Sequence, residues 1–326
     1  MSPRVDVALQ ADFDFERPGS GAETAVEKAR ELLAHTLIRA KPHEKQALQA
    51  WFEDWAEGDQ HTFTYAEGVF DAQRRTIAKH LGELEGLRIL ELGPGHTLAP
   101  GLLLYVNGAR YYAAADLFPL AARASSLYRR FRDHIARRPV LIPTPSLEET
   151  RAEVLRRFDE AVDTKGAEAV FDATKVDWRC PVDAAKLPFA DESFDVIFSN
   201  AAFEHFMDPE ASVKETARVL APGGVGLHQI DFRDHRDSTR PLDFLVYEDE
   251  EWKRINADMV CYTNRLRKHD FEETFAKAGL RVELVEPNLR RPLEPGIRER
   301  LHPRFRDRPL EDLEVLSAFF VVRKAS

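Results

Sequence analysis

The sequence predicts an α/β protein built on a doubly wound, mostly parallel β-sheet. Three observations support this prediction. A short apolar strand at 87–92 is followed by a glycine turn and a helix, a second apolar strand ends at Asp116, and a further strand of buried character covers Phe194–Ser199. This order is typical of the βαβ units of nucleotide-binding sheets.

The glycine turn after the first strand indicates a cofactor site. Gly93 and Gly95 let the backbone turn sharply and approach a ligand closely, which a Cβ atom would obstruct. Asp116 follows about 20 residues later at the end of the next strand, where a carboxylate can accept hydrogen bonds from both hydroxyls of a ribose. We therefore expect a cofactor that contains a ribose.

The residues around this turn favour an amino-acid-containing cofactor over a dinucleotide. A dinucleotide fingerprint requires a third small residue where this chain has Leu98. Glu91 precedes the turn, and its anion would repel a pyrophosphate but suits the α-ammonium group of an amino acid. A nicotinamide-dependent oxidoreductase remains an alternative, because it would use the same type of sheet.

Composition limits the classes of partner. The chain has 326 residues, 44% of them hydrophobic, and can bury a large core. Its net charge of −10 argues against a nucleic-acid partner, which needs clustered cations. No apolar run reaches membrane-spanning length, the first residues lack a signal core, and Cys180 and Cys261 form no disulfide framework. We expect a cytoplasmic protein that binds neither nucleic acid nor membrane.

A helical segment precedes the sheet. Apolar residues recur at helical spacing in three stretches, 22–40, 48–58 and about 66–84. We treat residues 1–80 as an N-terminal helical cap and 81–326 as the main domain. The aromatic residues of the cap, together with Phe63 and Tyr65, either roof an acceptor pocket or pack against the sheet.

An insertion at about 120–175 is longer than one crossover helix requires, and two helices are expected there, at 120–137 and 146–161. The first helix and the residue after it carry six arginines, and such a cluster can hold an acidic acceptor group or simply form a solvated helix face. The arginines are Arg123, Arg129, Arg130, Arg132, Arg137 and Arg138.

Two motifs together define a family resemblance. The first is E-x-G-x-G at 91–95 with the downstream Asp116, and the second is D-A-A-K-L-P-F-A-D-E-S-F-D at 183–195, followed by a strand and Glu204-His205. In these motifs the chain resembles the Rossmann-like S-adenosylmethionine (SAM) methyltransferases, and among them the ubiquinone-biosynthesis type that acts on small molecules. The resemblance extends over about 81–324, and it excludes the cap and the insertion.

The resemblance implies SAM as cofactor, a seven-stranded sheet with an antiparallel last strand, and a set of cofactor contacts. Glu91, Gly93, Gly95 and Asp116 would bind SAM through the first motif. In the second motif, Asp183 would accept from the adenine amine, the Ala184 N–H would contact the ring, and Asn200 would lie beside the methionine portion; a turn cap is the structural alternative for Asp183.

The C-terminal third contains expected helices at 208–220 and 268–278, strands at 280–285 and 315–322, and stretches read as irregular at 241–260 and as a polar loop after 285. The run His228, Asp231, Asp234 and His235 invites a metal interpretation, but neighbouring strand residues face opposite ways, so we assign no metal ligand. The segment 264–267, N-R-L-R, also resembles a bacterial subgroup linked to glycan and natural-product clusters.

These features predict a SAM-dependent methyltransferase with a small-molecule acceptor, such as a natural product or glycan precursor. The activated methyl group needs an acceptor atom in line with the S–CH₃ bond and exclusion of water. An oxygen acceptor also needs a base, for which a histidine is suited. His205 is the first candidate and His228 the second. A catalytically silent SAM-binding protein remains a further alternative.

Overall fold

The computed structural model describes residues 61–118, 120–137, 147–235, 239–256 and 263–325. The chain divides into two compact units, Met1–His61 and Thr62–Ser326. The fold given below is that of the second unit. The two helices expected within 22–58 lie outside the described residues, as do Arg138 and Cys261.

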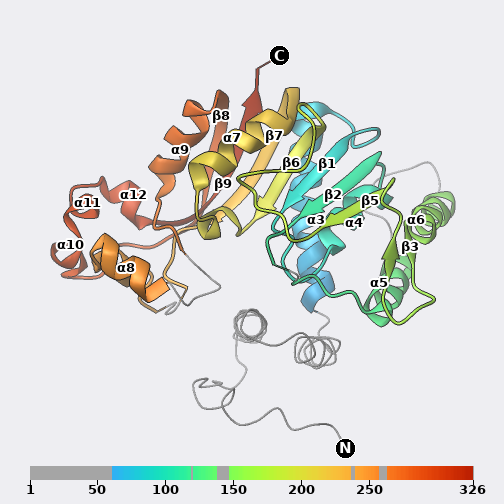
Figure 1. Ribbon diagram of the computed structural model, residues 1–326, viewed down its shortest axis with the longest axis horizontal. Helices are drawn as coiled ribbons and strands as arrows, with labels where there is room; N and C mark the ends of the chain where they lie inside the picture. Colours follow the sequence, from blue (N-terminus) through green and yellow to red (C-terminus); the bar gives the residue numbers. More distant parts are fainter. Residues whose placement is uncertain (1–60, 119, 138–146, 236–238, 257–262, 326) are drawn as a thin grey trace, which may run out of the picture. The chain divides into compact units, whose positions relative to one another are not determined.

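A seven-stranded sheet forms the centre of the second unit (Figure 1). Its strands lie in the order β5-β2-β1-β6-β7-β9-β8. Their bounds are β1 Arg88–Leu92, β2 Tyr111–Ala115, β5 Val176–Arg179, β6 Phe194–Asn200, β7 Leu220–Asp231, β8 Leu280–Arg290 and β9 Val315–Lys324. The pairs from β5 to β7 are parallel, whereas β9 runs antiparallel to β7 and β8. The predicted doubly wound, mostly parallel sheet with an antiparallel last strand is confirmed.

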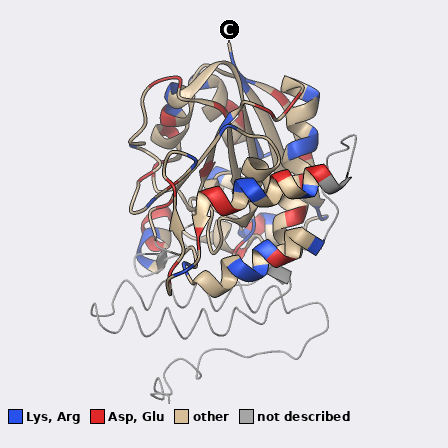
Figure 2. Ribbon diagram, turned by 90° about the vertical axis from the view of Figure 1, so that its right-hand side faces the viewer, with Lys and Arg blue, Asp and Glu red and all other residues tan. Residues whose placement is uncertain are grey.

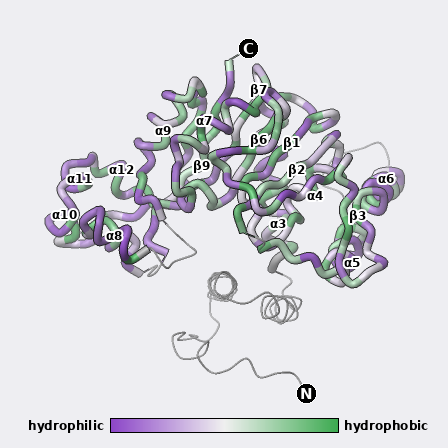
Figure 3. The backbone as a smooth tube through the Cα atoms, viewed as in Figure 1, coloured by the Kyte–Doolittle hydropathy of each residue, from purple (hydrophilic) through white to green (hydrophobic). Residues whose placement is uncertain are grey.

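Helices cover both faces of the sheet, because side chains alternate along each buried strand. In β1, Ile89 joins the cluster packed against α3 (His61–Leu81), α4 (Ala99–Val106), α5 (Ser125–Arg137) and α6 (Leu147–Ala161). The next residue, Leu90, joins the cluster packed against α7 (Pro209–Val219) and α9 (Lys268–Lys277). Figure 3 shows hydrophobic segments along these central strands.

The helix starts and ends follow local chemistry. Asp208 caps α7, since its side chain accepts from the Ala211 N–H at 2.9 Å and Pro209 occupies the first turn. The first insertion helix begins at Ser125, later than expected. A short hairpin of β3 (Val162–Asp163) and β4 (Val170–Phe171), which the sequence did not predict, follows α6.

The stretch at 241–260 was expected to be irregular and the stretch after 285 to be a polar loop, and both expectations were wrong. The two stretches contain a third apolar cluster that includes Trp252 and Phe305. Its elements are η3 Asp243–Val246, α8 Asp249–Asn256, α10 Ile297–Arg300, α11 Pro303–Arg306 and α12 Leu310–Glu314. These helices are eight residues or shorter, so the periodicity that marks a helix in sequence is too brief to detect.

Three arginines of the insertion, two on α5 and one just before it, contact neighbouring segments. Arg132 pairs with Asp159 of α6 at 2.5 Å, Arg123 lies 3.3 Å from Glu168, and Arg129 donates to the Thr164 carbonyl at 2.7 Å. Figure 2 shows basic and acidic residues interspersed along the helices on this side. Packing within the insertion therefore explains the contacts of these three arginines.

Gly101 in α4 makes room for the fully buried Tyr112 of β2. A Cβ on Gly101 would lie 2.0 Å from the Tyr112 ring, so Gly101→Ala forces one of the two elements to move. We expect a loss of about 1–3 kcal/mol in the free energy of unfolding, measured by chemical denaturation. Gly68→Ala is the matched control, because Gly68 lies in α3 with nothing near its missing Cβ. A stability of Gly101→Ala equal to that of the control would contradict this packing.

Candidate cofactor and acceptor site

The glycine turn leaves β1 at the carboxyl edge of the sheet, where ligands bind in doubly wound folds. Gly93 and Gly95 both have positive φ, +65° and +64°, which side chains rarely adopt. A Cβ on Gly93 would lie 2.8 Å from the Cβ of Ala202, in the loop that follows β6. The turn and this loop are therefore packed together, as a shared cofactor floor requires.

Asp116 lies beside the turn, immediately after β2. Its carboxylate accepts from the N–H groups of Phe118 at 3.0 Å and Gly95 at 3.4 Å. Burial raises the pKa of Asp116 to about 6, although these backbone hydrogen bonds act to lower it. The carboxylate is thus fixed at the turn, and its ionised form, which predominates above pH 6, can accept hydrogen bonds from two hydroxyl groups.

Glu91 lies beneath the turn and is almost fully buried. It accepts a hydrogen bond from the hydroxyl of Tyr112 at 2.5 Å. Burial raises the pKa of Glu91 to about 8, the Tyr112 hydrogen bond acts against this, and the charge of Asp116 adds to it. A cation bound above the turn would favour ionised Glu91, so the site suits the positively charged methionine portion of SAM.

The raised pKa of Glu91 predicts a pH effect on the protein without cofactor. Between about pH 4.5 and 8 the folded state holds a proton on Glu91 that the unfolded state has lost, so stability falls as pH rises through this window. Glu91→Gln keeps an acceptor for Tyr112 but does not titrate. We expect the wild type to lose more stability than Glu91→Gln between pH 5 and 8.5, by on the order of a few kcal/mol in urea denaturation. Parallel curves for the two proteins would contradict the burial of an ionisable Glu91.

Asn200 ends β6 at the same edge. Its side-chain amide donates to the hydroxyl of Tyr65 in α3, and the Tyr65 ring lies 6.1 Å from the ring of His96 in the glycine turn. The first helix of the described chain therefore delivers an aromatic side chain to the expected methionine end of the site. Phe63, by contrast, packs on Phe131 at 5.2 Å.

Asp183 and Ala184 lie in the loop after β5, which is held to the strand edge because the Val182 N–H donates to the Asp116 carbonyl at 2.8 Å. The Asp183 side chain is exposed and accepts from the Ala185 N–H at 2.9 Å. Asp183 therefore caps a turn, which is the structural role considered above, and its exposure leaves the carboxylate open to a ligand. The adenine contact therefore stays a prediction.

His228 lies in the core. It is fully buried between Phe203 and Phe275, and its Nδ1 lies 2.9 Å from the hydroxyl of Ser199. Burial lowers the pKa of His228 to about 3, so the ring is neutral. Because a base must reach the acceptor's proton, we do not carry His228 forward as a catalytic residue.

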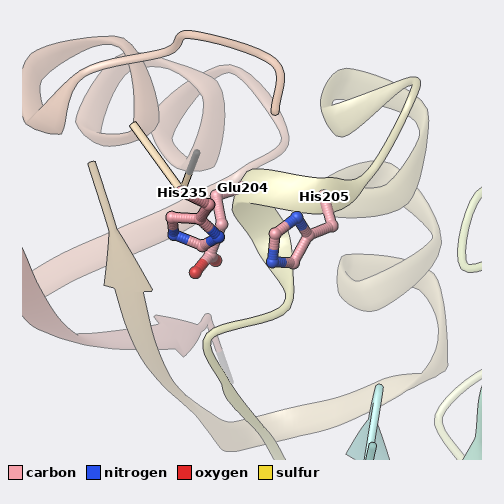
Figure 4. A group of neighbouring side chains, drawn as sticks. All are labelled: Glu204, His205 and His235. Carbon is pink, nitrogen blue, oxygen red and sulfur yellow. The ribbon is translucent and has the colours of Figure 1, made fainter. Parts of the chain in front are cut away.

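His205 lies on η2 (Phe203–His205), a single turn that follows the Asn200 loop. Its ring centroid is 4.9 Å from that of His235, and Glu204 lies with the two histidines (Figure 4). Ligand atoms of the three side chains lie within 4.8 Å of one another. The sequence places His235 thirty positions away, so the structure brings together a group that spacing did not indicate.

Comparison with known proteins confirms the predicted resemblance. Residues 150–227 match the methyltransferase domain family. The chain is 52% identical over 42 residues to the malonyl-[acyl-carrier protein] O-methyltransferase of Methylococcus capsulatus, covering 13% of this chain and 15% of that protein. It is 36% identical over 67 residues to the ubiquinone biosynthesis O-methyltransferase of Parvibaculum lavamentivorans, covering 21% and 26%.

The aligned segments thus span a small part of these curated relatives. A solved Haloferax volcanii complex of the Trm112 methyltransferase activator with a putative methyltransferase aligns over 84% of this chain and 97% of the other, with 19% identity and a TM-score of 0.41. The family match supports a methyltransferase domain over residues 150–227, for which SAM is the expected cofactor. No helix among the residues that the structure describes is long and apolar enough to cross a membrane.

Two partners of the site were not predicted from the sequence. Tyr112 is one, and its signal was a polar aromatic residue at a buried position of β2, in register with Ile89 and two residues from the partner of Glu91. Glu204 is the other. It belongs to the E-H motif, but its neighbours Phe203 and His205 did not indicate that it would be buried.

Proposed function

We propose that the chain is a SAM-dependent methyltransferase that acts on a small-molecule acceptor. The observation that supports this most strongly is the carboxylate of Asp116, which is held by the backbone of the glycine turn where a ribose would lie. Glu91, Gly93, Gly95, Asp116, Asp183, Ala184 and Asn200 form the proposed cofactor site.

In the proposed reaction the protein aligns the acceptor with the S–CH₃ bond and excludes water, since the sulfonium methyl group is already activated. Two of the relatives above are named O-methyltransferases, which favours an oxygen acceptor. His205 is the residue that we assign to activating this oxygen. Direct proton transfer to the imidazole is one form of that role, and the neighbours of His205 support a second form, described below.

We propose that α3 and the residues before it contribute to acceptor specificity. Tyr65 supports this, because its hydroxyl contacts Asn200 at the expected methionine end. In this proposal residues 1–80 form a cap on the domain at 81–326.

Binding and turnover measurements test the function. Isothermal titration should show SAM binding and no binding of NADH, whereas NADH binding alone would support the nicotinamide alternative. A screen of metabolite extracts should then yield S-adenosylhomocysteine in an acceptor-dependent manner. SAM binding without turnover on any extract would favour the catalytically silent alternative.

A further inference from the structure

A buried carboxylate lies against two histidines at the edge of the proposed acceptor site. Glu204 is 1% exposed, and its Oε1 accepts from the Asp231 N–H at 3.3 Å. Its Oε2 is also buried but has no hydrogen-bond partner among the residues that the structure describes. Burying a carboxylate oxygen without a hydrogen-bond partner costs free energy, so we expect this atom to bind a ligand.

The two imidazoles reach this carboxylate from separate elements. His205 follows Glu204 on η2, and His235 lies in the loop after β7. The ligand atoms of the three side chains lie within 4.8 Å of one another, and Figure 4 shows the carboxylate and the ring nitrogens gathered in one place. We propose that Glu204, His205 and His235 form a binding site for one divalent transition-metal ion.

The donor set fits such an ion. Two imidazoles and one carboxylate are a common set for zinc and for non-haem iron, and imidazole suits these metals better than calcium or magnesium. Ligands about 2.0–2.2 Å from a tetrahedral ion are about 3.3 Å apart, so binding requires the side chains to draw together by about 1.5 Å at most. Three protein ligands leave at least one position open for water or substrate.

The surroundings hold the ligands in place. Asn264 fixes the backbone of η2. Its side-chain amide donates to the carbonyls of Phe203 at 2.8 Å and Phe206 at 3.2 Å, and its backbone N–H donates to the Glu204 carbonyl. Asp231 lies 3.7 Å from Nε2 of His235, so a movement of less than 1 Å would bring the two into the hydrogen bond by which carboxylates orient metal-bound histidines. Arg233 pairs with Asp231 at 2.5 Å.

The location of the site beside the proposed acceptor indicates a role for the ion in the reaction. This role rests on the proposed methyl transfer. The ion would bind the acceptor hydroxyl at its open position and lower the pKa of that hydroxyl. The proton passes to solvent water, the oxygen forms a bond to the methyl carbon, and the S–CH₃ bond breaks with its electron pair left on sulfur. No metal ligand was assigned from the sequence, whereas this proposal assigns three.

Metal analysis of the full-length, tag-free protein tests the site without SAM or acceptor. After removal of metal with EDTA and dialysis, titration with Zn²⁺ and with Mn²⁺ should show one tightly bound equivalent of at least one ion. Glu204→Gln and His235→Gln should each weaken that binding at least tenfold. His269→Gln is the matched control, because His269 lies on α9 within 3.4 Å of Glu272 and Glu273 but is 62% exposed.

Three outcomes would overturn the proposal: no bound equivalent, equal affinity in the wild type and both variants, or an equal loss in the control. Asp231→Asn guards against misfolding of the ligand variants, since it alters no ligand and should weaken binding about 10–100-fold while the far-ultraviolet circular dichroism is retained. Methyl transfer by a protein that binds no ion would leave the proposed function intact. Metal binding without SAM binding would reject the function and keep the site.

Discussion

Replacing His205 with alanine is expected to lower kcat for methyl transfer to an oxygen acceptor by about 10²–10⁴-fold. His205 lies on the turn that follows Asn200, and that loop packs on the glycine turn through Ala202 and Gly93. In the proposed function the ring acts on the acceptor and does not bind SAM, so we expect SAM affinity to change little. Steady-state kinetics and SAM titration measure the two effects, with His269→Ala as the control for loss of an exposed histidine.

Chelation distinguishes the two forms of this role. If His205 accepts the proton directly, EDTA-treated wild type keeps its kcat. If His205 acts through a bound ion, EDTA-treated wild type falls to the level of His205→Ala, and treatment of the variant causes no further loss. A variant whose kcat remains within about twofold of the wild type would exclude both forms for an oxygen acceptor.

Much of the fold could be predicted because its signals are local. The strand 87–92, the buried strand before Asn200 and the cap at Asp208 are each determined by residues adjacent in the chain, and the structure places all three as expected. The strand expected at 315–322 followed from its own pattern, but its antiparallel direction was inferred from the family resemblance, since nothing within its own sequence sets that direction.

The parts that escaped prediction depend on tertiary contacts. Glu91 was expected to point at the cofactor as an anion, but burial raises its pKa, and its hydrogen-bond partner Tyr112 comes from a different strand and needs the space that Gly101 leaves. His228 was a reasonable base by position, yet a strand residue at that edge can face the core or the site, and alternation alone does not say which. Glu204 and His235 approach each other only because β6 and β7 are neighbours in the sheet.

The N-R-L-R segment shows how a motif with a functional resemblance can serve the fold. Arg267 is fully buried and donates to the carbonyls of Phe232 at 2.5 Å and Val315 at 2.7 Å. Arg265 donates to the Tyr247 carbonyl at 2.7 Å. These arginines therefore connect the C-terminal helices to the ends of β7 and β9.

Asp116→Ala is expected to weaken SAM binding at least about tenfold, because hydrogen bonds to a charged group contribute roughly 1.5–3 kcal/mol. Asp163→Ala is the matched control, since Asp163 likewise accepts a backbone N–H two residues on, at 2.9 Å from Lys165. The pKa of about 6 adds a second test. Protonation removes the charge below that value, so wild-type affinity should fall as pH drops from 7 to 5, while Asp116→Asn, which cannot ionise, should show weaker binding with a smaller slope. Unchanged affinity in a folded Asp116→Ala protein would show that the carboxylate stabilises the glycine turn without contacting the ribose.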